Sequence, residues 1–176
     1  MSKKQEKNSA TIKSVNETIS YSGEVTIKLL KGKKVIKSEK IKNNCTVTLL
    51  KSLTMFLENI VDTNLLPKYM GLGTESSGWT INTLHLMKEV PNSRVPIVRH
   101  SIEELNSERT LVGYKAPFSA TFPSNIIAGL EIKELGLFSG SYGNDNLLAR
   151  IPVSIPKIDA GLSLVIEWVI SIKNKD

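Results

Sequence analysis

Hydrophobic and polar residues alternate most regularly in the last apolar run of the chain, residues 162–173. Apolar side chains there occupy every second position, and most of the residues between them are polar. The apolar positions are Leu162, Leu164, Ile166, Trp168, Ile170 and Ile172. A period of two places successive side chains on opposite faces of a sheet, so the run predicts a strand with one buried face.

Several other strand-like runs precede this one. Two breaks containing Gly, Asn and Asp divide residues 131–174 into three runs, and residues 94–103 and 109–118 predict a strand pair around Asn106-Ser107. With a hairpin nearer the amino terminus, the total is about seven strands separated by turn residues. This pattern is typical of a mainly β protein, and we expect an antiparallel β-sandwich.

The amino-terminal third predicts a hairpin at residues 23–42. Val25, Ile27 and Leu29 alternate with polar residues, and a Lys-Gly-Lys turn separates them from a second β-branched run. Gly32, at the centre of this turn, suits a positive φ angle. Apolar residues then recur at steps of three and four, which predicts an amphipathic helix at residues 46–62 that closes the core.

The domain organisation follows from these elements. Residues 1–20 are polar and aperiodic, so we expect a flexible amino-terminal arm that orders on assembly. Residues 21–176 are then expected to form a single β-sandwich domain that includes the hairpin and the helix, which suits a chain of 176 residues.

Positive charge is concentrated at the amino-terminal end. Residues 1–51 carry twelve Lys and four acidic residues, a net charge of +8, whereas residues 52–176 have a net charge of −2. The basic part contains no Arg and one aromatic residue, Tyr21, whereas nucleic-acid sites usually combine Arg with stacking rings. Lys on the face or edge of a sheet is therefore favoured over nucleic-acid binding. No run of about 20 apolar residues predicts a membrane segment.

Candidate catalytic and metal-binding residues do not form a recognisable set. Cys45 is the single cysteine, and His85 and His100 lack metal-ligand spacing, so we expect no metal and no cofactor. The Gly71–Thr74 segment lacks the Lys of a phosphate-binding loop. We therefore predict that the chain is not an enzyme.

Three residues of the carboxy-terminal strands have expected structural roles. Gly136 is expected to admit a close neighbour at a crowded position. Glu134 and Arg150 are expected to pair across a hairpin, which would contribute about 0.2–1 kcal/mol if the pair were exposed.

The order of short motifs resembles a family of tailed-phage and prophage virion proteins. The resemblance covers residues 67–174, and its motifs are Gly71-Leu72-Gly73-Thr74, Leu84…Glu89…Arg94, Glu134-Leu135-Gly136-Leu137-Phe138, Leu147-Leu148-Ala149-Arg150 and Ile166-Glu167-Trp168-Val169-Ile170. The plan is similar to that of the domain that joins tail fibres to baseplates. The resemblance implies a structural, non-enzymatic subunit of the tail, baseplate, fibre attachment or neck–collar, assembled in the host cytoplasm and located in the virion.

The resemblance also implies the partners of the chain. We expect other virion structural proteins and further copies of the chain, in threefold, sixfold or twelvefold symmetry. Apart from the resemblance, whose motifs do not include the hairpin, we expect contact residues at Trp79 and Thr74 in the loop after the glycines, and at Lys31, Lys33 and Lys34 in the hairpin turn. Two alternatives stay open: a receptor- or carbohydrate-binding module using the Trp79 loop, and a nucleic-acid-binding protein using the Lys-rich hairpin.

Overall fold

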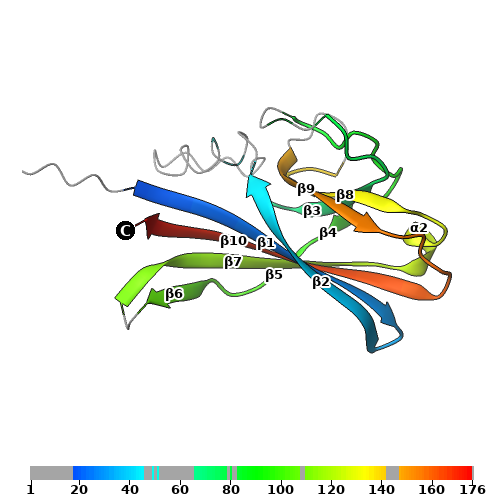
Figure 1. Cartoon of the computed structure of the whole chain (residues 1–176), viewed down its shortest axis with the longest axis horizontal. Helices are drawn as coiled ribbons and strands as arrows, with labels where there is room; N and C mark the ends of the chain where they lie inside the picture. Colours follow the sequence, from blue (N-terminus) through cyan, green and yellow to red (C-terminus); the bar gives the residue numbers. More distant parts are fainter. Residues whose placement is uncertain are drawn as a thin grey trace, which may run out of the picture.

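Two antiparallel sheets pack face to face in the computed structural model (Figure 1), which describes residues 18–45, 49, 51, 66–78, 80, 83–107, 110–141 and 147–175. The predicted mainly β fold is thus confirmed, and the arrangement is that of a β-sandwich. Among the described residues, no helix is long and apolar enough to cross a membrane.

The first sheet contains the longest strands. Its order is β2-β1-β10-β7, and β5 and β6 both pair with β7. The strands are β1 (Thr18–Lys31), β2 (Lys34–Cys45), β5 (Val98–Arg99), β6 (Glu103–Ser107), β7 (Thr110–Phe122) and β10 (Leu162–Lys175).

The second sheet is shorter and has the order β4-β3-β8-β9. Its strands are β3 (Tyr69–Gly73), β4 (Val95–Pro96), β8 (Ile132–Phe138) and β9 (Leu147–Ile155). A single helical turn, α2 (Ser124–Ile127), connects β7 to β8 and places Ile127 in the core.

Two chain segments run from one sheet to the other. The first is β2, which pairs with β1 up to Asn43 and then with β9 through Asn44 and Cys45. The second is the segment from β4 to β5, in which Val95 pairs with β3 and Arg99 pairs with β7. These crossings hold the two sheets together at opposite sides of the sandwich (Figure 1).

The alternating run supplies the centre of the core, as its period predicts. Leu164, Ile166, Trp168 and Ile170 are buried, and β10 pairs with β1 on one side and β7 on the other. Met70, Leu72, Leu135, Leu137 and Ile151 face them from the second sheet as members of the same apolar cluster. Each large apolar side chain that is buried in this way contributes roughly 1.5–3 kcal/mol of transfer free energy.

The predicted hairpin is confirmed and is longer than expected. It is formed by β1 and β2, and Gly32 in its turn has φ 58°. Because β1 begins at Thr18, the predicted arm is wrong for residues 18–20, which belong to the strand. Pairing with β10 over the whole of β1 accounts for this extension, since tertiary pairing can order residues that lack apolar periodicity of their own. Residues 1–17 lie outside the described residues.

The predicted helix at residues 46–62 and the predicted break at Asn106-Ser107 have different outcomes. Most of residues 46–62 lie outside the described residues, although Leu49 and Lys51 are helical, with Leu49 buried in the core and Lys51 exposed. The predicted break at Asn106-Ser107 is wrong, because both residues pair with β7 as part of β6.

Candidate functional site

A buried ion-pair cluster lies on the outer face of the second sheet. It is formed by Glu134 from β8, Arg150 from β9, and Glu89 and Arg94 from the segment that follows β3. Since side chains alternate along a strand, Leu135 and Leu137 point into the main core while Glu134 and Phe138 point to this outer face. The predicted pairing of Glu134 with Arg150 is present in the structure.

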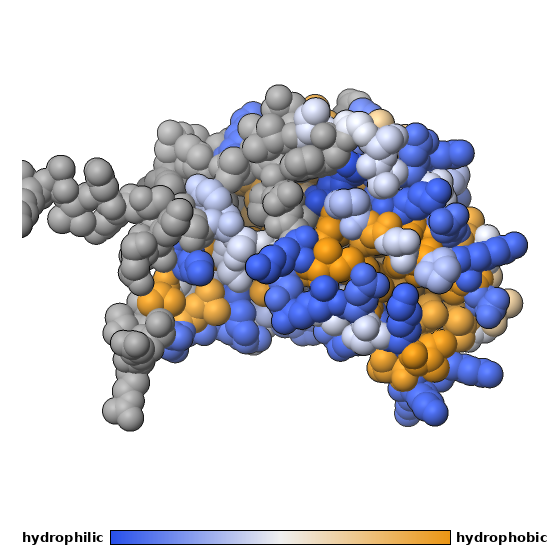
Figure 2. Space-filling view, in the orientation of Figure 1, coloured by the Kyte–Doolittle hydropathy of each residue, from blue (hydrophilic) through white to orange (hydrophobic). Residues whose placement is uncertain are grey.

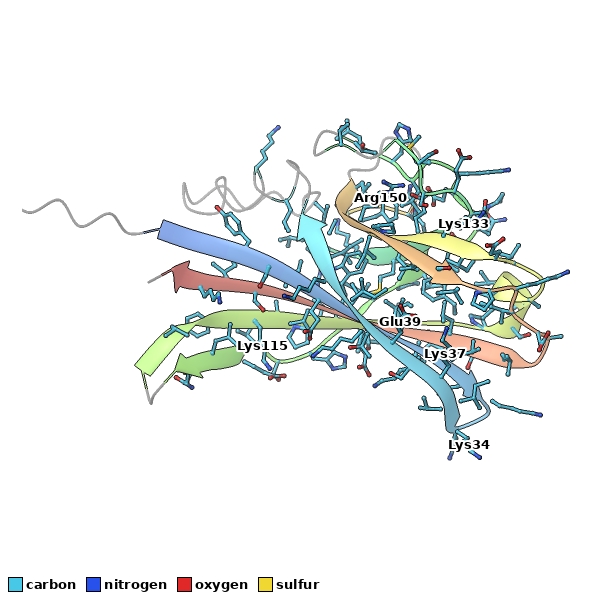
Figure 3. All side chains as sticks on the ribbon, viewed as in Figure 1. Lys34, Lys37, Glu39, Lys115, Lys133 and Arg150 are labelled. Carbon is cyan, nitrogen blue, oxygen red and sulfur yellow. The ribbon has the colours of Figure 1, made fainter. Side chains whose placement is uncertain are left out.

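The Glu134–Arg150 pair is fully enclosed, which the strand order alone does not predict. The Arg150 Nε atom donates to Glu134 Oε2 at 2.5 Å, and both side chains are 0% exposed. Glu134 Oε1 accepts a second hydrogen bond from the backbone N–H of Lys88, at 3.1 Å. Figure 3 shows Arg150 pointing into the region between β9 and the covering loop.

The Arg150 guanidinium is incompletely satisfied. Its Nη1 and Nη2 atoms are buried and have no hydrogen-bond partner among the described residues. Removing a charge from water costs several kcal/mol, and the attraction to one carboxylate offsets this cost only when the other donors are also paired. The pair therefore contributes to the position of the two chain segments more than to net stability.

The second pair, Glu89–Arg94, fixes the segment that covers the cluster. Arg94 Nε and Nη2 donate to Glu89 Oε1 and Oε2 at 2.6 and 2.8 Å, a bidentate arrangement. Arg94 Nη1 donates to the Gly140 carbonyl at 3.1 Å, and the guanidinium carbon lies 3.8 Å from the centre of the Phe138 ring. Arg94 thus connects its own segment to the end of β8.

Three glycines make room for these side chains. A Cβ at Gly73 would overlap the Glu134 carboxylate, and one at Gly71 would lie 3.0 Å from the Phe138 ring and 3.3 Å from Arg94 Cγ. A Cβ at Gly136 would lie 2.5 Å from Phe138 Cε2. The expected close approach at Gly136 is confirmed, and the approaching group is an aromatic ring.

The covering segment is also held by its backbone and by apolar contacts. Thr74 N donates to Lys88 O, Val90 N donates to Leu72 O, and Glu89 forms an isolated bridge with Gly73. Leu86 is buried against Phe138 and Leu147, with Tyr69 at the margin. A second, smaller apolar core therefore lies beneath this segment.

This geometry does not suit phosphate binding at the Gly71–Thr74 segment. The Glu134 carboxylate occupies the space over Gly73, and the Thr74 amide is bonded to Lys88 O. A phosphate would meet a negative charge instead of free N–H donors. The structure thus supports the rejection of the phosphate-loop interpretation.

The predicted contact residues lie in different places. Thr74 is half-buried after β3 of the second sheet, whereas Lys31, Lys33 and Lys34 are exposed at the tip of the β1–β2 hairpin in the first sheet. The structure does not bring them together in one site. Trp79 lies outside the described residues.

Residues of the other candidate chemistry are also separate. His85 and His100 are both exposed, and His100 Nε2 lies 2.9 Å from Ser119 Oγ. Among the described residues there is no group of three or more His, Cys, Asp or Glu side chains suited to hold a metal ion.

The pairing of Glu89 with Arg94 and the bond from Lys88 N to Glu134 were not predicted from the sequence. The sequence feature that could have indicated the cluster is the order of the motifs. The L…E…R, E-L-G-L-F and L-L-A-R segments each supply one or two residues of the cluster. Comparison with known proteins adds nothing to this, since no protein-family model, curated protein or solved structure matches the chain.

Proposed function

We propose that the chain is a non-enzymatic structural subunit of a tailed-phage particle, located at the tail, baseplate, fibre attachment or neck–collar. It acts through contacts with other virion proteins and with further copies of itself, and it is assembled in the host cytoplasm. The support for this proposal is the motif order that resembles phage virion proteins, together with the place where those motif residues meet.

The observation that carries the proposal is the convergence of the motif residues. Gly71, Gly73, Glu89, Arg94, Glu134, Gly136, Phe138 and Arg150 are spread over eighty positions of the printed sequence and contact one another in the ion-pair cluster. Segments that resemble a family only by their order therefore form one structural unit in this chain. Motif residues are expected to contact one another when the motifs together specify a fold. Short sequence matches that arise by chance are not expected to do so.

The cluster is suited to a structural role. Its charged groups are buried or half-buried and bonded to one another or to backbone atoms, so they hold residues 83–94 against the second sheet. A covering segment fixed in this way presents a defined surface to a partner. In the first sheet, β2 from Lys34 to Asn43 pairs on one side only among the described residues, and such an edge suits contacts between subunits.

Immunogold labelling of purified particles tests the proposal. Antibodies against the recombinant chain are expected to label one station of the particle, such as the tail tip or the neck, on most particles. Antibodies against a non-structural protein of the same phage serve as the control. Particles that carry no label, with the chain found only in the lysate, would contradict the proposal.

A further inference from the structure

The first sheet has an unpaired edge at β2. This strand pairs with β1 on one side, and on the other side it pairs with β9 only through Asn44 and Cys45. Within the part of the chain that the structure describes, residues 34–43 have no second partner strand, and they are called the β2 edge below. The free N–H and C=O groups of such an edge can hydrogen-bond to an added strand.

A β-bulge at Ile36 divides the β2 edge. The register of β2 against β1 skips this residue, because Val35 and Lys37 are opposite consecutive residues of β1. A bulge disrupts pairing locally and redirects a side chain. Ile36 is 48% exposed and lines an apolar groove. The regular part of the edge is therefore residues 37–43, which is long enough to pair with a strand of ordinary length.

The groove lies between the two sheets, where β2 and β9 diverge. It has a volume of about 180 Å³ and is lined by Ile27 and Leu164 from the first sheet. Ile155, which ends β9, and Ile158 just after it line the groove from the opposite side. Figure 2 shows hydrophobic surface between β2 and the end of β9. Alternate side chains of a strand added to β2 face the second sheet, so one of them can enter this groove.

Unpaired positive charge surrounds the groove, and Figure 3 shows labelled charged residues along β2. Two of the four lysines of β2 have an acidic neighbour, Glu24 for Lys40 and Glu39 for Lys37. The exposed lysines of the hairpin and the groove wall that form no ion pair with another described residue are Lys31, Lys33, Lys34, Lys42 and Lys157. Asp159 also lines the groove, but the surplus is positive and favours an acidic partner.

Two charged side chains of β2 face the groove. Lys37 is opposite Leu29 and Glu39 is opposite Ile27, so both lie on the core-facing side of the strand. Charged residues that point inward hinder the pairing of an edge strand with an arbitrary partner. A strand that pairs with the β2 edge has to match them, which favours a specific partner over general aggregation.

Charge disfavours a segment of the chain itself as the added strand. Residues 1–17, which lie outside the described residues, carry four lysines and two glutamates. A second copy of β2 would bring its own four lysines to the edge. Like charges opposite one another destabilise strand pairs, whereas opposite charges stabilise them. The favoured occupant is therefore an acidic segment of another protein.

We infer that the β2 edge binds an extended, acidic segment of a different protein, which adds a strand beside residues 37–43 and places an apolar side chain in the groove next to Ile36. Apolar residues of this segment alternate with Asp or Glu. Its acidic side chains lie on the outer face of the sheet, where Lys40 and Lys42 lie, because residues directly opposite one another share a face. The inference rests on the proposed function in taking the partner to be another structural protein of the same particle.

A peptide array tests the chemistry of the partner. Its peptides, each of about nine residues, carry Ile, Val, Leu or Phe at alternate positions. Three sets differ only in the intervening residues, which are Asp and Glu, Ser and Thr, or Lys and Arg, and a fourth set consists of overlapping peptides of the chain itself. The full-length chain is expected to bind the acidic set in preference to the other three, and more weakly as salt is added.

Variants at the β2 edge locate the binding site. Ile36→Asp places a carboxylate beside the groove, and Lys42→Glu replaces a cation that faces the acidic residues. Each is expected to weaken the binding of an acidic array peptide, measured by fluorescence anisotropy, about tenfold or more. Val98→Asp, at another exposed apolar residue, and Lys133→Glu on β8 are the controls and are expected to bind as the original chain does. Hydrogen exchange within residues 37–43 is expected to slow on binding, since edge N–H groups become bonded.

Four results would overturn the inference: no array peptide bound, basic peptides bound as well as acidic ones, peptides of the chain itself bound best, or binding that neither variant weakens. The third result would assign the edge to a second copy. Circular dichroism and thermal unfolding establish that each variant is folded, as expected for exposed residues. The inference and the proposed function fail separately. Unlabelled particles with acidic peptides bound at β2 contradict only the phage assignment, and labelled particles with no peptide bound contradict only the β2 site.

Discussion

Glu134 and Arg150 show how the meaning of a charged pair depends on its burial. Their positions on neighbouring strands predicted a pair across the hairpin, with a small effect if the pair were exposed. The structure encloses both, adds a backbone donor to the carboxylate, and leaves two guanidinium nitrogens without a partner among the described residues. Removing one member of an enclosed pair therefore costs far more free energy of unfolding than removing one member of a surface pair.

A double-mutant cycle at this pair is expected to show strong coupling. Glu134→Leu and Arg150→Met should each lower the free energy of unfolding by about 3–5 kcal/mol, since each leaves one charge buried and unpaired. The double variant removes both charges and should be less destabilised than either single variant. Urea unfolding measures the three values.

The exposed Glu103–Lys115 pair provides the comparison, and Glu103→Leu should cost less than about 1 kcal/mol because the pair is in contact with solvent. A double variant at Glu134 and Arg150 whose cost equals the sum of the single costs would show that the buried charges are not coupled.

Gly73 is the glycine at which a side chain is least tolerated. A Cβ there would overlap the Glu134 carboxylate, so Gly73→Ala is expected to destabilise the chain by about 1–3 kcal/mol, in the range of overpacked cores. Thermal unfolding would measure the change. Gly71→Ala, which meets a ring edge at 3.0 Å, should cost less. Equal stability of the Gly73→Ala variant and the original chain would contradict this packing.

At the scale of secondary structure, the position of residues 83–94 depends on a few specific contacts. Arg94 bonds to Glu89 in its own segment and to the Gly140 carbonyl after β8. Two backbone hydrogen bonds, from Thr74 N and Val90 N, lie within the region that Arg94 holds in place. The local stability of this segment is therefore expected to follow the Arg94 contacts.

Arg94→Lys tests this dependence, because an ammonium group cannot reproduce the bidentate geometry. Hydrogen exchange at the Val90 and Thr74 amides is expected to accelerate about tenfold or more, which corresponds to a local loss of about 1.4 kcal/mol. Amides of β10 such as that of Trp168 should be unaffected.

Arg99→Lys is the matched control for Arg94→Lys, since Arg99 makes one bond to the Pro67 carbonyl outside this segment. Unchanged exchange at Val90 in the Arg94 variant would show that other contacts hold the segment.

The strands that were predicted well are those with local signals. The alternation from Leu162 to Ile172 identified β10 and its buried face, and Gly32 identified the hairpin turn. The break at Asn106-Ser107 was wrong because turn-forming residues can be accommodated within a strand that has a long partner, here β7. The start of β1 was placed too late for the same reason, since β10 pairs with it as far as Thr18.

The candidate site was predicted only in part. The Glu134–Arg150 contact follows from the order of two strands, but its burial does not, because no local pattern indicates that residues 84–94 fold over this face. Glu89 and Arg94 belong to a segment without regular period, where spacing carries no information about contact. Long-range contacts of this kind require the tertiary structure.

At the scale of the whole molecule, the two sheets have different roles in this account. The second sheet is closed on its outer face by the ion-pair cluster and its covering segment. The first sheet contains the Lys-rich β1–β2 hairpin, in which β2 alone carries four lysines and one glutamate. Lys28 on β1 and Lys40 on β2 form ion pairs with Glu167 and Glu24, so these two lysines are engaged within the chain.

A repeated structural part of a phage particle, as proposed for this chain, has a fixed copy number, and that number is the most direct quantity to measure. Quantitative mass spectrometry of purified particles would give the ratio of this chain to a tail or neck protein of known symmetry. The account predicts that the chain is present at a fixed multiple, threefold, sixfold or twelvefold, and stays with the particle after high-salt washing. Absence from purified particles, or a copy number that varies between preparations, would contradict it.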